Sequence, residues 1–219
     1  MNLTISKAAT TAMGVPAAED MALINALTLG ELEPNDVYIF RVKACNDQVD
    51  RDFERFTGAS LEKLAQLFEG KPGIFDHKWS AKEQTARIYR AETALREDGG
   101  MDLVFHCYML RNEENQRIID AIYGGILKEV SVGCAISRAV CNICGREYGT
   151  CGHRKGESYD GKLCVCELHD PVDAYEFSFV AVPAQPGAGV TKSHHHSGFT
   201  PAEIAAAKDR IAIEHERWK

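Results

Sequence analysis

Runs of apolar residues bounded by polar turns predict a chain built mainly from strands. Five segments are rich in β-branched and aromatic residues, as strands are. These segments cover residues 37–45, 85–96, 101–110, 128–137 and 174–183. The turn sequence Asp98-Gly99-Gly100 separates the second segment from the third, so we expect these two segments to pair as an antiparallel hairpin.

A second pattern, with apolar residues three and four positions apart, predicts helices over 17–27, 61–68 and 113–122. Asn112 can cap the third of these helices. A fourth helix is indicated near the end of the chain, where Thr200 is an N-cap, Pro201 suits the first helical position and Glu203 completes a capping box. A linker rich in Gly, Ser and His precedes this helix, and we therefore expect the helix to lie apart from the core.

Several strands, few helices and no alternation of strand with helix favour a mainly β fold of the α+β class. We expect a closed or partly closed antiparallel β-barrel with peripheral helices. A length of 219 residues is enough for one sizeable core. The expected parts are a mobile N-terminal arm (1–35), the barrel core (36–139 and 170–190), a cysteine-rich insertion (140–169), and a linker with the C-terminal helix (191–219).

Composition narrows the class of protein further. With 45% hydrophobic and 26% charged residues, the chain is neither disordered nor fibrous. A formal net charge of −7 argues against a general nucleic-acid-binding surface. No apolar run reaches about 18 residues and the N-terminus lacks the layout of a secretory signal, so we expect no membrane segment and a cytoplasmic location.

Five of the eight cysteines lie in one short polar segment, at positions 141, 144, 151, 164 and 166. In a reducing compartment this crowding favours a metal over disulfides. Cys141 and Cys144 have the spacing of a zinc knuckle, and Cys151 and His153 offer a second pair of ligands. A closed shell of these four residues leaves no position for a reactive water, so the insertion is predicted to bind one structural zinc ion.

Two alternatives stay open for this zinc site. Cys164 and Cys166 could replace Cys151 and His153 as the second pair of ligands. A zinc ribbon could also bind nucleic acid, but the few basic residues of the insertion are offset by acidic ones, so no nucleic acid is expected.

Candidate catalytic residues stand within the apolar segments. Neither a G-x-S-x-G elbow nor an H-E-x-x-H helix is present. Ser131 lies in EVSVGC, Glu176 and Ser178 lie in YEFSFVAVP, and His77 ends the run GIFDH. Each of these residues alone also has a purely structural explanation.

Taken in order, four short segments resemble the tailed-phage prohead proteases, a family related in fold to the herpesvirus capsid maturation protease, assemblin. The segments are VDRDFERF, FDH, KEVSVG and EFSFVAVPAQPG, and the resemblance covers about residues 36–190. It implies a β-barrel ringed by helices. The cysteine-rich insertion departs from the compact family pattern.

The resemblance also implies roles for single residues. His77 matches the general base and Ser131 matches the nucleophile of this serine protease family. Glu176 matches the variable third position, with Asp170 and Asp173 nearby as rival carboxylates. The donors for the oxyanion are not identified, although Gly133, Arg138 and the turn at Pro186-Gly187 are candidates.

The implied function is a maturation endopeptidase that acts inside the immature phage prohead in the host cytoplasm. Its expected substrates are the scaffold protein, the scaffolding region of the major capsid protein, and the protease itself. A homo-oligomer is left open. The competing interpretation is a non-enzymatic capsid assembly or scaffold protein of the same fold, stabilised by zinc.

Overall fold

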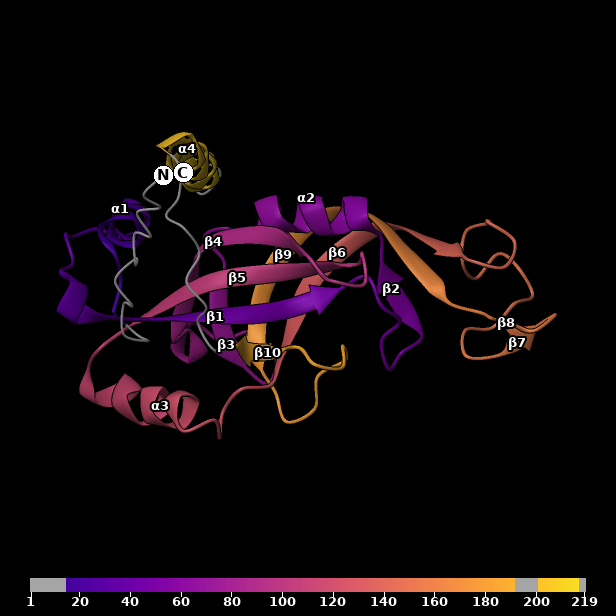
Figure 1. The fold of residues 1–219 in the computed structure, drawn as a ribbon, viewed down its shortest axis with the longest axis horizontal. Helices are drawn as coiled ribbons and strands as arrows, with labels where there is room; N and C mark the ends of the chain where they lie inside the picture. The colour runs from indigo at the N-terminus through magenta and orange to yellow at the C-terminus, as the bar shows by residue number, and fades with distance from the viewer. Residues whose placement is uncertain (1–14, 192–200, 217–219) are drawn as a thin grey trace, which may run out of the picture.

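A computed structural model describes residues 15–191 and 201–216 of the chain. Eight strands form one sheet, in the order β10-β1-β5-β4-β3-β9-β2, with β6 paired to the other edge of β9 (Figure 1). The strands of this sheet are β1 (Val37–Asn46), β2 (Glu54–Phe56), β3 (Pro72–Phe75), β4 (Ala86–Leu95), β5 (Met101–Leu110), β6 (Val130–Cys141), β9 (Cys166–Phe179) and β10 (Gly189–Thr191). The short strands β7 (Ser158–Tyr159) and β8 (Lys162–Leu163) pair separately. The helices are α1 (Ala18–Leu27), α2 (Gly58–Phe68), α3 (Glu113–Tyr123) and α4 (Pro201–Glu216), with 3-10 turns η1 (Pro34–Asp36) and η2 (Ala81–Glu83).

The mixed, mostly sheet class agrees with the sequence pattern, but a closed barrel is not confirmed. The predicted hairpin is present, since β4 and β5 pair antiparallel on either side of the glycine turn. Two pairings are parallel, β2 with β9 and β3 with β9. The sheet is therefore mixed, and the expectation of a purely antiparallel arrangement was wrong. The segment before β6 meets β10 at an isolated bridge between Glu129 and Gly189, beside a hydrogen bond of 2.7 Å from the Val190 amide to the Lys128 carbonyl.

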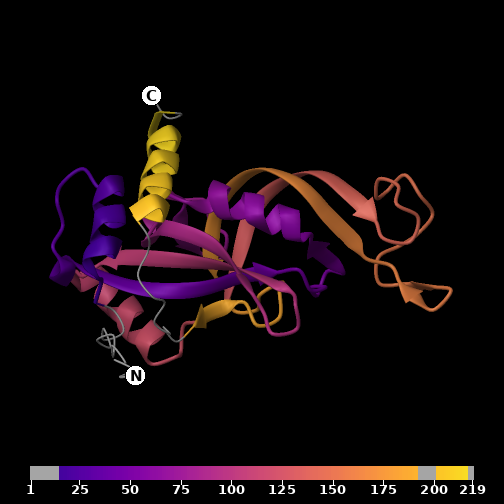
Figure 2. The same cartoon turned by 45° about the horizontal axis from the view of Figure 1, so that its top comes forward.

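The strands beside the insertion are longer than the sequence pattern predicted. β6 and β9 pair antiparallel from Val130–Phe179 to Cys141–Cys166, with shifts of register after Gly133 and after Ala135. The cysteine-rich insertion therefore sits at the tip of a two-stranded ribbon. Figures 1 and 2 show this ribbon extending away from the rest of the sheet, with β7 and β8 at its far end.

The core is packed on both faces of the sheet. On one face α2 buries Leu61, Leu64 and Phe68, and the rings of Phe68 and Phe105 lie 4.7 Å apart between centroids. On the other face α1 packs its apolar side against strands β1, β4 and β5. The described part of the expected N-terminal arm is thus a packed helix rather than a mobile segment.

The C-terminal helix also contacts the core, contrary to the expectation that it lies apart. Ile211 of α4 is buried, and Arg210 donates to the carboxylate of Glu69, which is itself buried at the end of α2. Because a buried carboxylate needs a partner, this ion pair holds α4 to the end of α2. The predicted N-cap Thr200 lies outside the described residues.

Candidate active site and metal centre

His77 is presented by a tight turn at the end of β3. Asp76 and His77 both have positive φ angles, 48° and 52°. Residues other than glycine rarely adopt this backbone conformation, which costs about 1–2 kcal/mol per residue. The turn is closed by a hydrogen bond of 3.0 Å from the Asp76 amide to the carbonyl of Phe179. A strained turn fixed in this way holds the imidazole in one direction.

The carboxylate of Glu176 contacts this imidazole directly. His77 Nδ1 lies 2.8 Å from Glu176 Oε1, and Glu176 is only 3% exposed. Ser178, two residues further along β9, donates from its hydroxyl to Glu176 Oε2 at 2.7 Å. The same hydroxyl accepts a hydrogen bond of 3.0 Å from the backbone amide of His77. Ser178 therefore orients both partners of the His77–Glu176 pair.

Sequence reasoning noticed Ser178 but gave it no role. The signal was available, because residues two positions apart on a strand point to the same face. Ser178 is fully buried and both its neighbours are bonded to it, so it is not an accessible nucleophile.

Ser131 is brought to the same face of the sheet. It pairs with Ser178 in the antiparallel β6–β9 ladder. Residues directly opposite in such a ladder point to one side, with Cβ atoms about 5 Å apart. Ser131 is partly exposed, and among the described residues no hydrogen bond joins its hydroxyl to the His77 ring. The sheet thus places Ser131 opposite Ser178, the residue that bonds both His77 and Glu176, while His77 and Glu176 are in direct contact through imidazole and carboxylate.

Gly133 makes room for the carboxylate. It stands opposite Glu176 in the same ladder, and a Cβ at position 133 would lie 2.3 Å from Glu176 Oε1. Any side chain there would displace the carboxylate. The glycine of the EVSVG segment thus has a packing role.

The two rival carboxylates are engaged elsewhere. Asp170 is exposed and pairs with Arg138 at 2.8 Å on the β6–β9 ribbon. Asp173 Oδ1 lies 3.8 Å from Lys71 Nζ. Arg138 is consequently not directed at His77, which removes it as a candidate oxyanion donor in this conformation.

A hollow of about 360 Å³ adjoins Ser131. One wall is β6, and the others come from the segment after β1 and from the loop after β9. Among its lining residues are Ser131, Gly133, Asp50, Glu54, Phe56, Ala184 and Gln185. The loop after β9, which includes the turn at Pro186-Gly187 named from the sequence, therefore reaches the neighbourhood of the candidate nucleophile.

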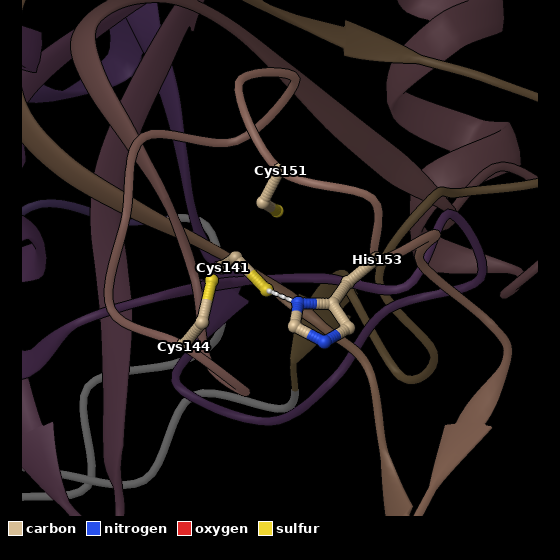
Figure 3. A group of neighbouring side chains, drawn as sticks. All are labelled: Cys141, Cys144, Cys151 and His153. Carbon is tan, nitrogen blue, oxygen red and sulfur yellow. Dashed lines mark hydrogen bonds between the residues drawn. The ribbon is translucent and has the colours of Figure 1, made fainter.

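A second group of side chains can hold one metal ion at the tip of the ribbon. The ligand atoms of Cys141, Cys144, Cys151 and His153 all lie within 4.8 Å of one another, and Figure 3 shows the four side chains converging. Cys141 Sγ is 3.6 Å from His153 Nδ1. This is about the edge length expected for a tetrahedral site with metal–sulfur and metal–nitrogen bonds of about 2.3 and 2.0 Å.

The backbone turn of the knuckle prepares one thiol for metal binding. The amide of Arg146 donates to the sulfur of Cys144 and, with the Arg146 guanidinium and His153, lowers the pKa of this thiol to about 6. A thiolate is the form that ligates metals.

Cys164 is a neighbour of this group rather than a member of it. Its sulfur lies 3.9 Å from that of Cys141, but burial raises the pKa of the Cys164 thiol to about 11. Cys166 is buried at the start of β9. The geometry thus favours Cys151 and His153 as the second pair of ligands.

No known protein-family model matches this sequence, and no curated protein matches it either. None of the helices in the described residues is both long enough and apolar enough to span a membrane.

Proposed function

We propose that the chain is a serine endopeptidase of the prohead maturation type, with Ser131 as nucleophile, His77 as general base and Glu176 as the orienting carboxylate. The observation that carries this proposal is the contact between His77 Nδ1 and Glu176 Oε1, beside a partly exposed serine on the same face of the sheet. A buried carboxylate bonded to one imidazole nitrogen is the arrangement that such catalysis needs.

The chemistry follows from this arrangement. His77 Nδ1 donates to Glu176, which leaves Nε2 free to accept the proton of the Ser131 hydroxyl as its oxygen attacks the peptide carbonyl. The imidazolium then gives this proton to the leaving amine, and an acyl-enzyme forms. Water, deprotonated by the same imidazole, attacks the acyl carbonyl; the ester bond to Ser131 breaks, and the imidazolium returns the proton to the Ser131 oxygen as the carboxylic acid product leaves. Glu176 stabilises the imidazolium in both steps.

The Ser131 hydroxyl is not yet within hydrogen-bond contact of the ring, which is common without substrate. The proposed attack requires a rotation about χ1 of Ser131, or the binding of a peptide, that brings the hydroxyl to Nε2. The proposed substrates are the scaffold protein, the scaffolding region of the major capsid protein and the chain itself, inside the immature prohead. We infer zinc as the metal of the Cys3His group, because three thiolates and one imidazole form a ligand set typical of structural zinc.

The decisive test replaces the proposed nucleophile. Ser131→Ala should reduce cleavage to background, because the hydroxyl that would form the acyl-enzyme is lost, while the fold is retained. The protein would be co-expressed with a phage scaffold protein and a major capsid protein as candidate substrates, and processing would be followed by intact-mass spectrometry. Ser137→Ala is the matched control, since Ser137 is an exposed serine of the same strand. Equal processing by Ser131→Ala and wild type would refute the assignment.

A second candidate function is a non-enzymatic assembly protein with a metal-stabilised arm. The separation of the Ser131 hydroxyl from His77 and the projecting ribbon favour it. This candidate predicts that neither serine variant changes processing and that both variants still assemble with the capsid protein.

A further inference from the structure

The metal-binding insertion contacts the loop before β2 and β2 itself, which together form residues 50–56. Lys155 Nζ lies 2.6 Å from Glu54 Oε1. Next to it, Phe53 covers Gly156 so closely that a Cβ on this glycine would lie 2.9 Å from the ring. The amide of Cys166 donates to the carbonyl of Phe53 at 3.0 Å. Lys155 and Gly156, which follow the last candidate ligand in the sequence, thereby contact residues 53 and 54.

Residues 50–56 also form a wall of the hollow beside Ser131. Glu54 and Phe56 line that hollow, and Asp50 and Asp52 lie in the same wall. Arg51, between them, donates its backbone amide to the carbonyl of Ala184 at 3.1 Å and its guanidinium to the carbonyl of Pro183. Residues 50–56 therefore contact the insertion on one side and the loop after β9 on the other.

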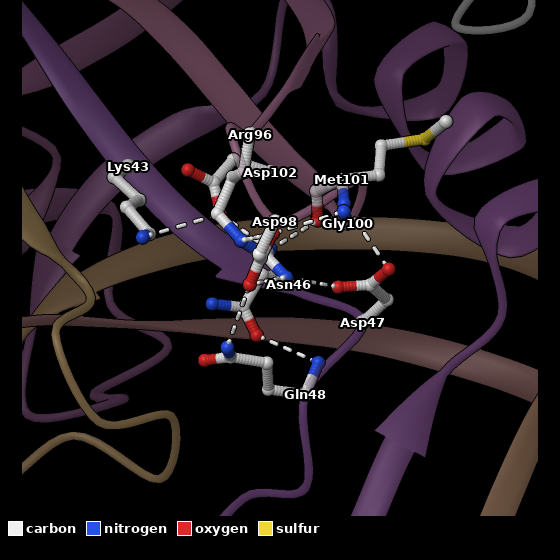
Figure 4. Close-up of polar contacts among 9 residues, drawn as sticks. All are labelled: Lys43, Asn46, Asp47, Gln48, Arg96, Asp98, Gly100, Met101 and Asp102. Carbon is white, nitrogen blue, oxygen red and sulfur yellow. Dashed lines mark hydrogen bonds and ion pairs between the residues drawn. The ribbon is translucent and has the colours of Figure 1, made fainter.

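The start of this loop is anchored to the hairpin of β4 and β5. Arg96 Nη2 lies 2.8 Å from Asp47 Oδ1, and the other carboxylate oxygen of Asp47 accepts from the amide of Met101 at 3.1 Å (Figure 4). The beginning of the loop is fixed by this network, and its end is fixed by the pairing of β2 with β9. In the middle, the amide of Phe53 donates to the carbonyl of Asp50 at 3.2 Å, and the Phe53 ring packs against Gly156 of the insertion.

Phe53 itself needs this support. Its φ angle is 56°, in the left-handed region that residues other than glycine rarely adopt. The residue is 39% exposed. A strained residue keeps such a conformation only when its surroundings hold it there. Gly156, with a φ of 88°, supplies the surface on which the Phe53 ring rests.

We propose that Lys155 and Gly156 are positioning residues for the substrate hollow: through Glu54 and Phe53, the metal-binding insertion sets the shape of the wall that faces Ser131. The proposal rests on the proposed peptidase function for its meaning in catalysis. Neither residue touches Ser131, His77 or Glu176, so the effect of losing them falls on substrate binding rather than on the chemical step. It follows that KM changes while kcat is kept.

The test compares matched lysine variants on the same insertion. In Lys155→Met, KM for a peptide spanning a mapped cleavage site should rise about threefold, the factor that corresponds to a partly exposed ion pair, with kcat unchanged. Lys162→Met is the control, because Lys162 bonds only within the insertion, to the carbonyl of Asn142. Lys155→Arg should restore KM, since it keeps the charge that Glu54 accepts.

A second variant and a second readout keep the test independent of peptidase activity. Gly156→Ala places a methyl group against Phe53 and should raise KM more than Lys155→Met does. In both variants, amide hydrogen exchange across residues 51–56 should speed up relative to wild type, whereas Lys162→Met should leave it unchanged.

The outcomes separate this inference from the proposed function. If the wild-type protein cleaves no substrate, the proposed function fails, and the exchange measurement still tests the contact. If the wild-type protein cleaves, and Lys155→Met and Gly156→Ala match Lys162→Met in KM and in exchange, the inference is overturned. A fall in kcat with KM unchanged would also overturn it.

Discussion

At the scale of single residues, the candidate site depends on how closely Gly133 approaches Glu176. A methyl group at position 133 would overlap the carboxylate oxygen that bonds His77. We predict that Gly133→Ala lowers kcat/KM by about a hundredfold, because a displacement of about 1 Å in a positioned group has an effect of this order. The measurement is steady-state peptidase kinetics.

The control for Gly133→Ala is Gly30→Ala, in a turn where an added Cβ meets nothing within 4 Å. It should leave kcat/KM unchanged. Wild-type activity in Gly133→Ala would contradict the prediction that the position of the Glu176 carboxylate matters for catalysis.

Glu176 carries a prediction of its own. Glu176→Gln keeps the size of the side chain but removes the charge that stabilises the imidazolium and selects its tautomer. We predict that kcat falls by several orders of magnitude, up to about 10⁴, yet less than in Ser131→Ala. Asp170→Asn and Asp173→Asn should have little effect, since neither carboxylate contacts His77. Full activity in Glu176→Gln together with a loss in either asparagine variant would move the role to that aspartate.

At the scale of elements, the side chain of Arg96 contributes several of the contacts between the β4–β5 turn and the end of β1. Arg96 pairs with Asp47 at 2.8 Å, with Asp98 at 3.0 Å and with Asp102 at 2.9 Å. Without Arg96 these three carboxylates would repel one another at the same place. The hairpin is predicted by its turn sequence, whereas its attachment to residues 46–48 depends on this network.

We predict that Arg96→Met lowers the free energy of unfolding by about 1–2 kcal/mol, more than a single exposed ion pair contributes, because three partners are lost together. Urea denaturation would measure the change. Arg117→Met, on the exposed side of α3, is the matched control and should be nearly neutral. Equal stability of the two variants would show that the network contributes nothing measurable.

At the scale of the whole molecule, the sheet and the tip of the ribbon are stabilised by different means. The sheet buries its own apolar core, while the insertion is polar and gathers four side chains that could hold one metal ion. We predict that the purified protein contains one zinc ion per chain and that Cys144→Ser lowers this content. Metal removal should unfold the insertion first and leave the sheet folded. Elemental analysis, with hydrogen exchange before and after chelation, measures both effects.

Less than about 0.2 zinc per chain, under conditions in which a tight site is filled, would rule out the zinc site. Retained zinc in a Cys151→Ser/His153→Ala double variant would move the ligands to Cys164 and Cys166. Cys107→Ser is the control, because Cys107 is buried in the sheet core. It should leave the metal content unchanged.

What the sequence determined by itself was local. The hairpin of β4 and β5 followed from a glycine turn between two strand-like segments, and α3 followed from its cap at Asn112, whose side chain accepts from the amide of Asn115. The grouping of Cys141, Cys144, Cys151 and His153 could likewise be predicted, because all four ligands lie within one short segment. In each case neighbours in the chain are neighbours in space.

What only the tertiary structure decided was set by pairing between distant segments. His77 and Glu176 are 99 positions apart and meet because β3 and β9 pair in parallel, a pairing that no local pattern encodes. The same holds for the support from Ser178, for the docking of Arg210 on Glu69, and for the contact of Lys155 with Glu54. Side-chain periodicity states which face a residue takes, but the partner across the sheet depends on the burial of the whole core.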